Sequence, residues 1–277
     1  MTSFSTSKAA DELPSRRHLV PAGDYSTQDL SSQDLTGVDL SQAQLQRANL
    51  STCCLTRANL AGCDLSDANL EGVNLVGANL RGARLCRANL TGADLTGAIL
   101  IDADFCEATL SSANLFGITA PGIRFLGANL RGAQFVLADL SQGDFTNAVV
   151  AGASFERASL RNTRFANVVA HDACFEFADF QSAQLVESDF SRASLIGCDL
   201  GDATAQRCLF IECDFFWTRP NTLKMFDCIT ERVRWPQDPK IVASPQGVTP
   251  PQVTAIPLYR SATSPADRAQ IVRRHTN

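Results

Sequence analysis

The chain repeats every five residues, and this period rules out most ordinary folds. From Tyr25 to Phe215, every fifth residue makes a series of 39 positions, and Leu or Phe occupies 34 of them. The residue two places before each of these is mostly Ala and otherwise usually small. The exceptions to Leu or Phe are Tyr25, Ala120, Val150, Ala170 and Ala205, and no insertion breaks the register.

A period of five fits neither regular element. Five steps along an α-helix turn about 500°, so successive Leu residues would point to every side. In a strand an odd step alternates between the two faces. The Leu residues stay on one side only if the chain turns a corner in each unit, which predicts a coil whose turns stack around a shared core.

The charges predict how many units make one coil. Residues one coil apart should lie about 4.8 Å apart, where opposite charges attract and like charges repel. Within 25–215, eleven opposite-sign pairs and two like-sign pairs occur at an offset of 20, whereas offsets of 15 and 25 give no such excess. One coil therefore holds four repeats of five. The clearest alternating line is Asp64, Arg84, Asp104, Arg124, Asp144 and Arg164.

The Phe residues follow the same spacing. Phe105, Phe125, Phe145 and Phe165 form one column, and Phe135, Phe155 and Phe175 form another, half a coil away. Half a coil leads to the opposite wall, so we expect two facing Phe stacks. Between nine and ten coils at about 4.8 Å each predict a rod roughly 45 Å long.

Units such as "ANLTG", "ADLTG" and "ANLRG" resemble the A(D/N)LXX signature of the pentapeptide-repeat proteins. The resemblance covers residues 25–215 and implies an all-β fold, a right-handed quadrilateral parallel β-helix. In such a helix the small residue and the Leu or Phe point inward. Some members of the family bind DNA gyrase or topoisomerase IV as DNA mimics and protect them from quinolones, and others are secreted bacterial effectors.

Both ends of a solenoid need caps because they expose core and unpaired edges. Residues 1–24 are polar and are expected to be largely disordered, with 19–25 closing the first coil. Residues 216–235 show helical spacing and predict a short capping helix. Beyond it, 236–277 is a proline-rich, basic and flexible tail. The candidate residues for the cap, or for a homodimer contact through it, are Leu223, Phe226, Ile229 and Val233.

No arrangement of residues indicates catalysis. His171 is the one histidine inside the repeat, and an exposed polar corner explains it better than a nucleophilic pair with Cys174. No phosphate-binding or zinc-binding motif is present, so we expect no cofactor and no metal. No apolar run reaches the roughly 20 residues of a membrane span. Because five of the ten cysteines replace the small core residue, a reduced cytoplasmic setting is favoured.

The surface charge carries what functional signal there is. Residues 101–215 hold 15 acidic and 7 basic residues, and both like-sign pairs at an offset of 20 occur there. The column positions predict an acidic edge, interrupted by Arg157, where a protein partner would bind. Its members are Asp139, Glu156, Glu176, Asp179 and Asp199.

Two functional hypotheses follow. In the first, the acidic rod mimics DNA and binds a type II topoisomerase, with DNA gyrase or topoisomerase IV as the specific partner and no direct binding of nucleic acid. In the second, the rod is a scaffold or interaction protein unrelated to topoisomerase. A secreted effector whose Ser-rich first residues direct its delivery is one version of this second hypothesis. An enzyme is disfavoured, because Leu, Phe and Ala fill the interior and leave no cleft.

Overall fold

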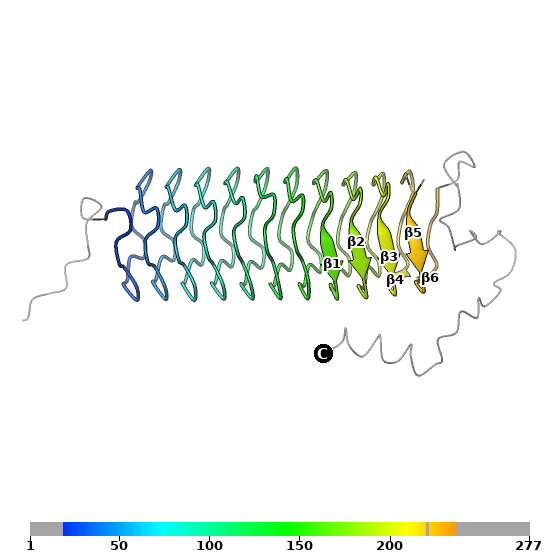
Figure 1. Ribbon diagram of the computed structural model, residues 1–277, viewed down its shortest axis with the longest axis horizontal. Helices are drawn as coiled ribbons and strands as arrows, with labels where there is room; N and C mark the ends of the chain where they lie inside the picture. Colours follow the sequence, from blue (N-terminus) through cyan, green and yellow to red (C-terminus); the bar gives the residue numbers. More distant parts are fainter. Residues whose placement is uncertain (1–18, 220–221, 237–277) are drawn as a thin grey trace, which may run out of the picture.

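The chain winds into a rod of stacked coils, seen side by side along the long axis in Figure 1. The computed structural model describes residues 19–219 and 222–236. Every backbone pairing between coils is parallel and joins positions 20 apart, from Asp24 with Gln44 onward. One such ladder, which starts at Asp24 and ends at Lys224, has eleven members. The predicted coil of four repeats is confirmed.

Regular strands are short because the chain turns in every five-residue unit. The six strands are β1 (Arg164–Ala166), β2 (Gln184–Val186), β3 (Thr204–Gln206), β4 (Leu209–Ile211), β5 (Lys224–Phe226) and β6 (Ile229–Glu231). One sheet has the order β1-β2-β3-β5, and the other pairs β4 with β6. Elsewhere in the described coils, single bridged residues take the place of strands, in four columns per coil.

A tight turn follows most of the inward-pointing Leu and Phe residues. In the unit that begins at Leu35, the amide of Val38 donates to the Leu35 carbonyl at 3.1 Å. The third residue of this turn, Gly37, has a φ of 65°, and the corresponding residue of most other units is also left-handed. Turns of this geometry favour Gly or Asn at that place. The five-residue period is therefore one extended segment plus one turn.

The core consists of the residues that the period singled out. Each Leu or Phe of the repeat is buried, and from Val38 to Thr218 so is the residue two places before each inward position. Rings in the two Phe columns stack at centroid distances of 4.7 Å for Phe145 and Phe165 and 4.8 Å for Phe135 and Phe155. Across the interior, Phe145 meets Phe155 edge-on at 6.0 Å. The two facing Phe stacks are confirmed, and their offset and edge-on contacts are the arrangements that aromatic quadrupoles favour.

The expected capping helix at 216–235 is wrong. β5 and β6 lie in this range, and the described part of it continues the coil, with Asp214 paired to Arg234. Trp235 stacks on Phe215 at 4.8 Å, as the next inward residue of its column. The helical spacing was misleading because Met225, Thr230 and Trp235 keep the five-residue step without Leu or Phe. The coil therefore runs past residue 215.

At the other end, the coil begins before residue 25. Leu19 is buried, and the backbone amide of Val20 donates to the Tyr25 hydroxyl at 2.7 Å. The amide of Ala22 already donates to the Ser41 carbonyl of the next coil at 2.8 Å. Residues 1–18 and 237–277, which carry the expectation of flexible ends, lie outside the described residues. Within the described ranges, the structure has no helix that could cross a membrane.

Candidate protein-interaction surface

The structure brings the five acidic candidates together in two neighbouring columns. Asp179 pairs with Asp199 in one ladder, and Asp139 precedes them with Ser159 between. Glu156 and Glu176 lie one coil apart on the corner that comes immediately before this ladder. We call these five residues the acidic edge.

Arginine side chains offset part of the charge of the acidic edge, and a neutral amide binds one of its carboxylates. Arg161 donates to Asp179 at 2.8 Å. Arg157 lies 3.7 Å from Glu156, and Arg219 follows Asp199 in its ladder. The Gln181 amide donates to Asp199 at 2.9 Å. The negative field is therefore interrupted at Glu156, at Asp179 and after Asp199 rather than continuous along the rod.

An apolar feature lies on the same corner as Glu156 and Glu176. Seven large hydrophobic side chains are exposed in the described residues, and four of them belong to this corner. The exposed fraction reaches 62% for Trp217. Singly exposed apolar residues are normal, but a row along one edge indicates an interaction site. We call this row the corner ridge, and its members are Phe116, Leu137, Phe177 and Trp217.

Three ridge residues also carry backbone strain. Leu137, Phe177 and Trp217 have φ values of 60°, 58° and 60°. Among the 29 non-glycine residues with positive φ in the described part, Ala22 is the only other apolar one. A left-handed conformation costs an L-residue roughly 1–2 kcal/mol. These side chains are therefore held at positions where both the backbone and the solvent disfavour them.

Neighbouring groups order the ridge. An added Cβ on Gly197 would lie 2.5 Å from the Phe177 ring, so that ring covers the bare glycine of the next coil. The Arg157 guanidinium lies 5.9 Å from the centre of the same ring. At the C-terminal end, Phe216 stacks on Trp217 at 4.9 Å. The ridge is therefore a row of three aromatic rings and Leu137, with acidic and basic groups among them.

A family model for pentapeptide repeats matches the chain in eight copies. The matched residues are 29–51, 53–92, 88–117, 110–147, 151–185 and 173–210. The chain is a pentapeptide repeat protein. This family is defined by its repeat rather than by a catalytic reaction.

Solved structures resembling this pentapeptide repeat protein include HetL, a protein of the cyanobacterium Nostoc sp. strain PCC 7120 involved in heterocyst differentiation regulation. HetL is 26% identical, with 77% of this chain and 87% of HetL covered and a TM-score of 0.37. A trypsin-treated variant of QnrB1, a plasmid-mediated fluoroquinolone resistance protein, is 19% identical. The match covers 66% of this chain and 89% of the QnrB1 chain, with a TM-score of 0.46. Rfr23 from the cyanobacterium Cyanothece 51142 is 25% identical. The match covers 51% of this chain and 87% of the Rfr23 chain, with a TM-score of 0.24. The comparison with curated proteins gives no match.

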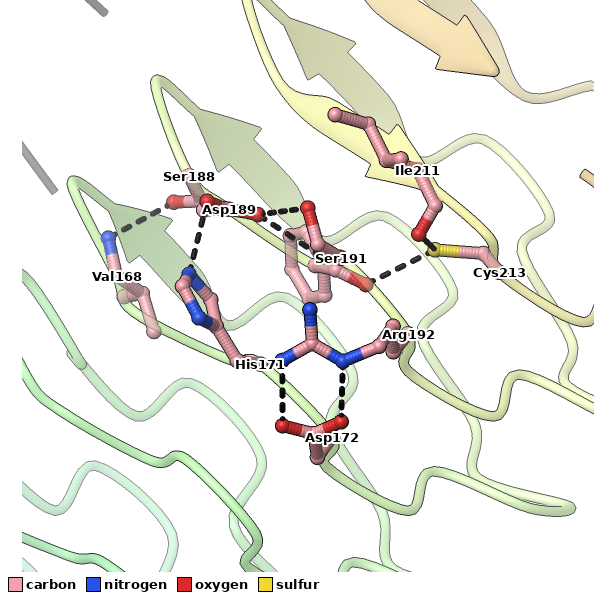
Figure 2. A network of polar contacts seen from close by, with 10 residues as sticks. Val168, His171, Asp172, Ser188, Asp189, Ser191, Arg192, Ile211 and Cys213 are labelled. Carbon is pink, nitrogen blue, oxygen red and sulfur yellow. Dashed lines mark hydrogen bonds and ion pairs between the residues drawn. The ribbon is translucent and has the colours of Figure 1, made fainter. Parts of the chain in front are cut away.

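The one histidine of this repeat protein's described coils serves a contact between coils, shown in Figure 2. The ring Nε2 of His171 lies 2.8 Å from a carboxylate oxygen of Asp189, and the Ser191 hydroxyl donates to the other oxygen at 2.5 Å. In a hydrolytic triad the histidine stands between the acid and the serine. Here both groups bind one carboxylate, so the arrangement does not activate a nucleophile. Beside it, Arg192 holds Asp172 through two hydrogen bonds.

The residues predicted for a cap or dimer contact do not share one face. Leu223 is buried in the core, whereas Phe226 is 51% exposed. Ile229 and Val233 are half-buried. Because only two of every five positions in this coil point inward, helical spacing does not collect these residues on one side. A dimer contact through this coil stays a prediction.

The corner ridge was not predicted from the sequence, although a signal for it exists. The second residue after each inward Leu or Phe is usually Gly, Asn, Asp, Ser, Arg or Gln. Leu137, Phe177 and Trp217 depart from that preference at intervals of two coils. Large apolar residues at a turn position that prefers glycine mark a site where function outweighs local preference.

Proposed function

We propose that this protein binds a protein partner through the corner ridge and the acidic edge beside it. The observation that carries the proposal is the set of three large apolar side chains held exposed at left-handed φ on one corner. Their arrangement suits a partner surface with apolar groups flanked by basic side chains. Aromatic residues, and Trp above all, are the usual hot spots of such interfaces.

A photo-crosslinking experiment tests this proposal. Benzoylphenylalanine replaces Phe177 in the full chain, and the partner captured in cells is identified and purified. The matched control carries the same group at Gln142, which occupies the equivalent turn position on another corner with a φ of 61°. Equal capture of the same protein at both corners would contradict a specific ridge site.

Asn substitutions then measure how much the corner ridge contributes to the free energy of binding that purified partner. Asn tolerates left-handed φ, so replacing Leu137, Phe177 and Trp217 together by Asn should preserve or raise the stability of the protein. Loss of a hot-spot Trp of about 2 kcal/mol should by itself weaken binding about thirtyfold. Calorimetry gives the dissociation constant, with Gln142, Ser182 and Asp202 replaced by Asn as the control. Unchanged affinity in the ridge variant would refute the proposal.

DNA mimicry toward DNA gyrase or topoisomerase IV is the second candidate, favoured by the excess of 15 acidic over 7 basic residues in 101–215. A supercoiling assay with and without a fluoroquinolone, at two salt concentrations, tests it. Inhibition or protection that weakens with salt supports mimicry. Replacing Glu156, Glu176, Asp179 and Asp199 by Lys should abolish this inhibition or protection. Full protection of the enzyme by that variant would refute DNA mimicry.

Two further expectations belong with this proposal. We propose that the coil is right-handed and quadrilateral, since parallel β crossovers are right-handed and four ladder columns run along each coil. We also propose a reducing, cytoplasmic setting, which the ten free thiols favour. The alternative, a secreted effector, predicts that deleting residues 1–20 blocks export. Unaffected export would refute that version.

A further inference from the structure

We propose that Cys208 and Cys228 are an oxidation site, where a reversible disulfide locks the last described coil onto the coil before it. The oxidant is a low-molecular-weight disulfide of the glutathione class. Two pairs of cysteines in the chain lie 20 residues apart, which is one coil: Cys86 with Cys106, and Cys208 with Cys228. The second pair occupies the small inward position of its units, two residues before Phe210 and Thr230.

The fold holds Cys208 and Cys228 in register. β4 pairs with β6 so that Leu209 faces Ile229, and the Ile229 amide donates to the Cys208 carbonyl at 2.9 Å. Neighbouring parallel strands lie about 4.8 Å apart, and disulfides join Cα atoms that are roughly 4.4–6.8 Å apart. The disulfide therefore needs no large displacement of either coil.

The two thiols already interact with each other. Elsewhere in the core, an inward thiol donates to a carbonyl of the preceding coil, at 2.7 Å for Cys53 and 2.9 Å for Cys213. The carbonyl nearest to the Cys208 thiol is instead that of Gln206 in its own coil, at 3.5 Å. The Cys208 thiol is also hydrogen-bonded to the Cys228 sulfur. Cys208 thus departs from the pattern of the other inward thiols in the direction that a disulfide requires.

The environments of the two thiols assign them different roles. Cys208 is buried, whereas Cys228 is half-buried and lies in the last described coil. The hydrogen bond from Cys208 lowers the pKa of Cys228, whereas burial and the Asp104 carboxylate raise the pKa of Cys86. The thiolate is the form that attacks a disulfide. Cys228 is therefore the attacking thiol, and Cys208 is the resolving thiol behind it.

The reaction is two successive thiol–disulfide exchanges. The Cys228 thiolate attacks one sulfur of the oxidant, whose S–S bond breaks and releases one thiolate. The Cys208 sulfur then attacks the Cys228 sulfur of this mixed disulfide and releases the second thiolate. The protons of the two protein thiols end on the two released thiols. The protein loses two S–H bonds and gains one S–S bond, and the oxidant is reduced to two thiols.

The locked coil supports the C-terminal end of the corner ridge. Arg234 of this coil lies 4.2 Å from the centre of the Phe216 ring and pairs with Asp214 at 3.1 Å. Phe216 in turn stacks on Trp217. Oxidation should therefore steady the Trp217 end of the ridge. This consequence rests on the proposed function, whereas the disulfide itself does not.

Oxidation of the folded full chain in glutathione buffers tests the proposal. The oxidised fraction of glutathione is raised stepwise without denaturant, free thiols are blocked, and mass spectrometry of unreduced peptides locates each disulfide. Hydrogen exchange of 222–236 is then compared between the reduced and oxidised protein. Cys228→Ala removes the attacking thiol. The matched control is Cys213→Ala, which replaces an inward thiol whose neighbour in the last coil is Val233.

We expect a Cys208–Cys228 disulfide that reduced glutathione reverses. Closing the loop between these residues should slow exchange in 222–236 about a hundredfold. Cys213→Ala should keep this slowing, and Cys228→Ala should lose it. Free thiols at both positions in fully oxidised glutathione, glutathione left on Cys228, a disulfide only between Cys86 and Cys106, or unchanged exchange after oxidation would each overturn the proposal. Partner binding is measured separately with the Asn variants, so failure of the disulfide leaves the ridge proposal standing.

Discussion

At the scale of single residues, turn positions in adjacent coils are matched to each other. The ring of Phe177 lies over Gly197, because the glycine has no Cβ to exclude it. Gly152 also has a left-handed φ, of 66°, but no atom within 4 Å of where its Cβ would be. A Cβ at Gly152 would therefore cost only the free energy of the left-handed backbone, whereas a Cβ at Gly197 would also collide with the Phe177 ring.

This difference makes a paired prediction. Gly152→Ala and Gly197→Ala should each lower the free energy of unfolding by roughly 1–2 kcal/mol, because both force an L-residue into left-handed φ. Only Gly197→Ala should move the Phe177 ring away from its place, which NMR shifts of that ring would record. An unchanged ring signal in Gly197→Ala would contradict the packing described above.

At the scale of one ladder, ion pairs between coils contribute to the response to acid. The hydrogen bond that Arg87 donates to Asp67, at 2.7 Å, lowers the pKa of that carboxyl from its ordinary value of 3.8. Arg192 lowers the pKa of Asp172 in the same way. A carboxyl with a lowered folded pKa contributes stability above its unfolded pKa, and this contribution is lost as the pH falls through the folded value.

Arg87→Gln should therefore bring the pKa of Asp67 back up toward 3.8. The variant should unfold in acid at a higher pH than the parent, and the two should converge below both pKa values. An NMR titration of the Asp67 carboxyl carbon gives the pKa directly, with Asp172 as the internal control. A value for Asp67 that does not rise would show that Arg87 is not its partner in solution.

The ladder also shows what the sequence could predict. The period of five and the Phe columns follow from buried residues, whose identity the core dictates, and the coil of four repeats follows from charges that are matched between neighbouring coils. The capping helix was wrong because Met225, Thr230 and Trp235 hold the period without Leu or Phe, and helical spacing matched by coincidence. The acidic edge was located by column, but its neutralising partners depend on side-chain directions that a column count does not give.

At the scale of the whole molecule, stability should vary along the rod. Each interior coil packs between two neighbours, and solenoids are stabilised by such nearest-neighbour contacts. The last described coil places half-buried Thr230 where the repeat elsewhere has mostly Leu or Phe. Its contribution to the core is correspondingly smaller.

Hydrogen exchange should follow this gradient. We expect the slowest amide exchange in the coils of Phe135 to Phe175 and the fastest, among described coils, in 222–236. Mass spectrometry of peptides spanning each coil measures the rates. Thr230→Leu should slow exchange in the last coil while leaving the central coils unchanged. Uniform rates along the rod would instead mean that the solenoid opens only as a single unit.

The alternating line from Asp64 to Arg164 has a consequence for how such a uniform chain folds correctly. Any coil of a nearly perfect repeat offers the same core to its neighbour, so a growing stack has little in its interior to stop it from skipping one coil. A skip would bring positions two coils apart into contact, and along this line every such contact joins like charges, as between Asp64 and Asp104. Repulsion between these like charges disfavours any register in which a coil is skipped. In the correct register, adjacent coils place opposite charges side by side along this line, and these attract.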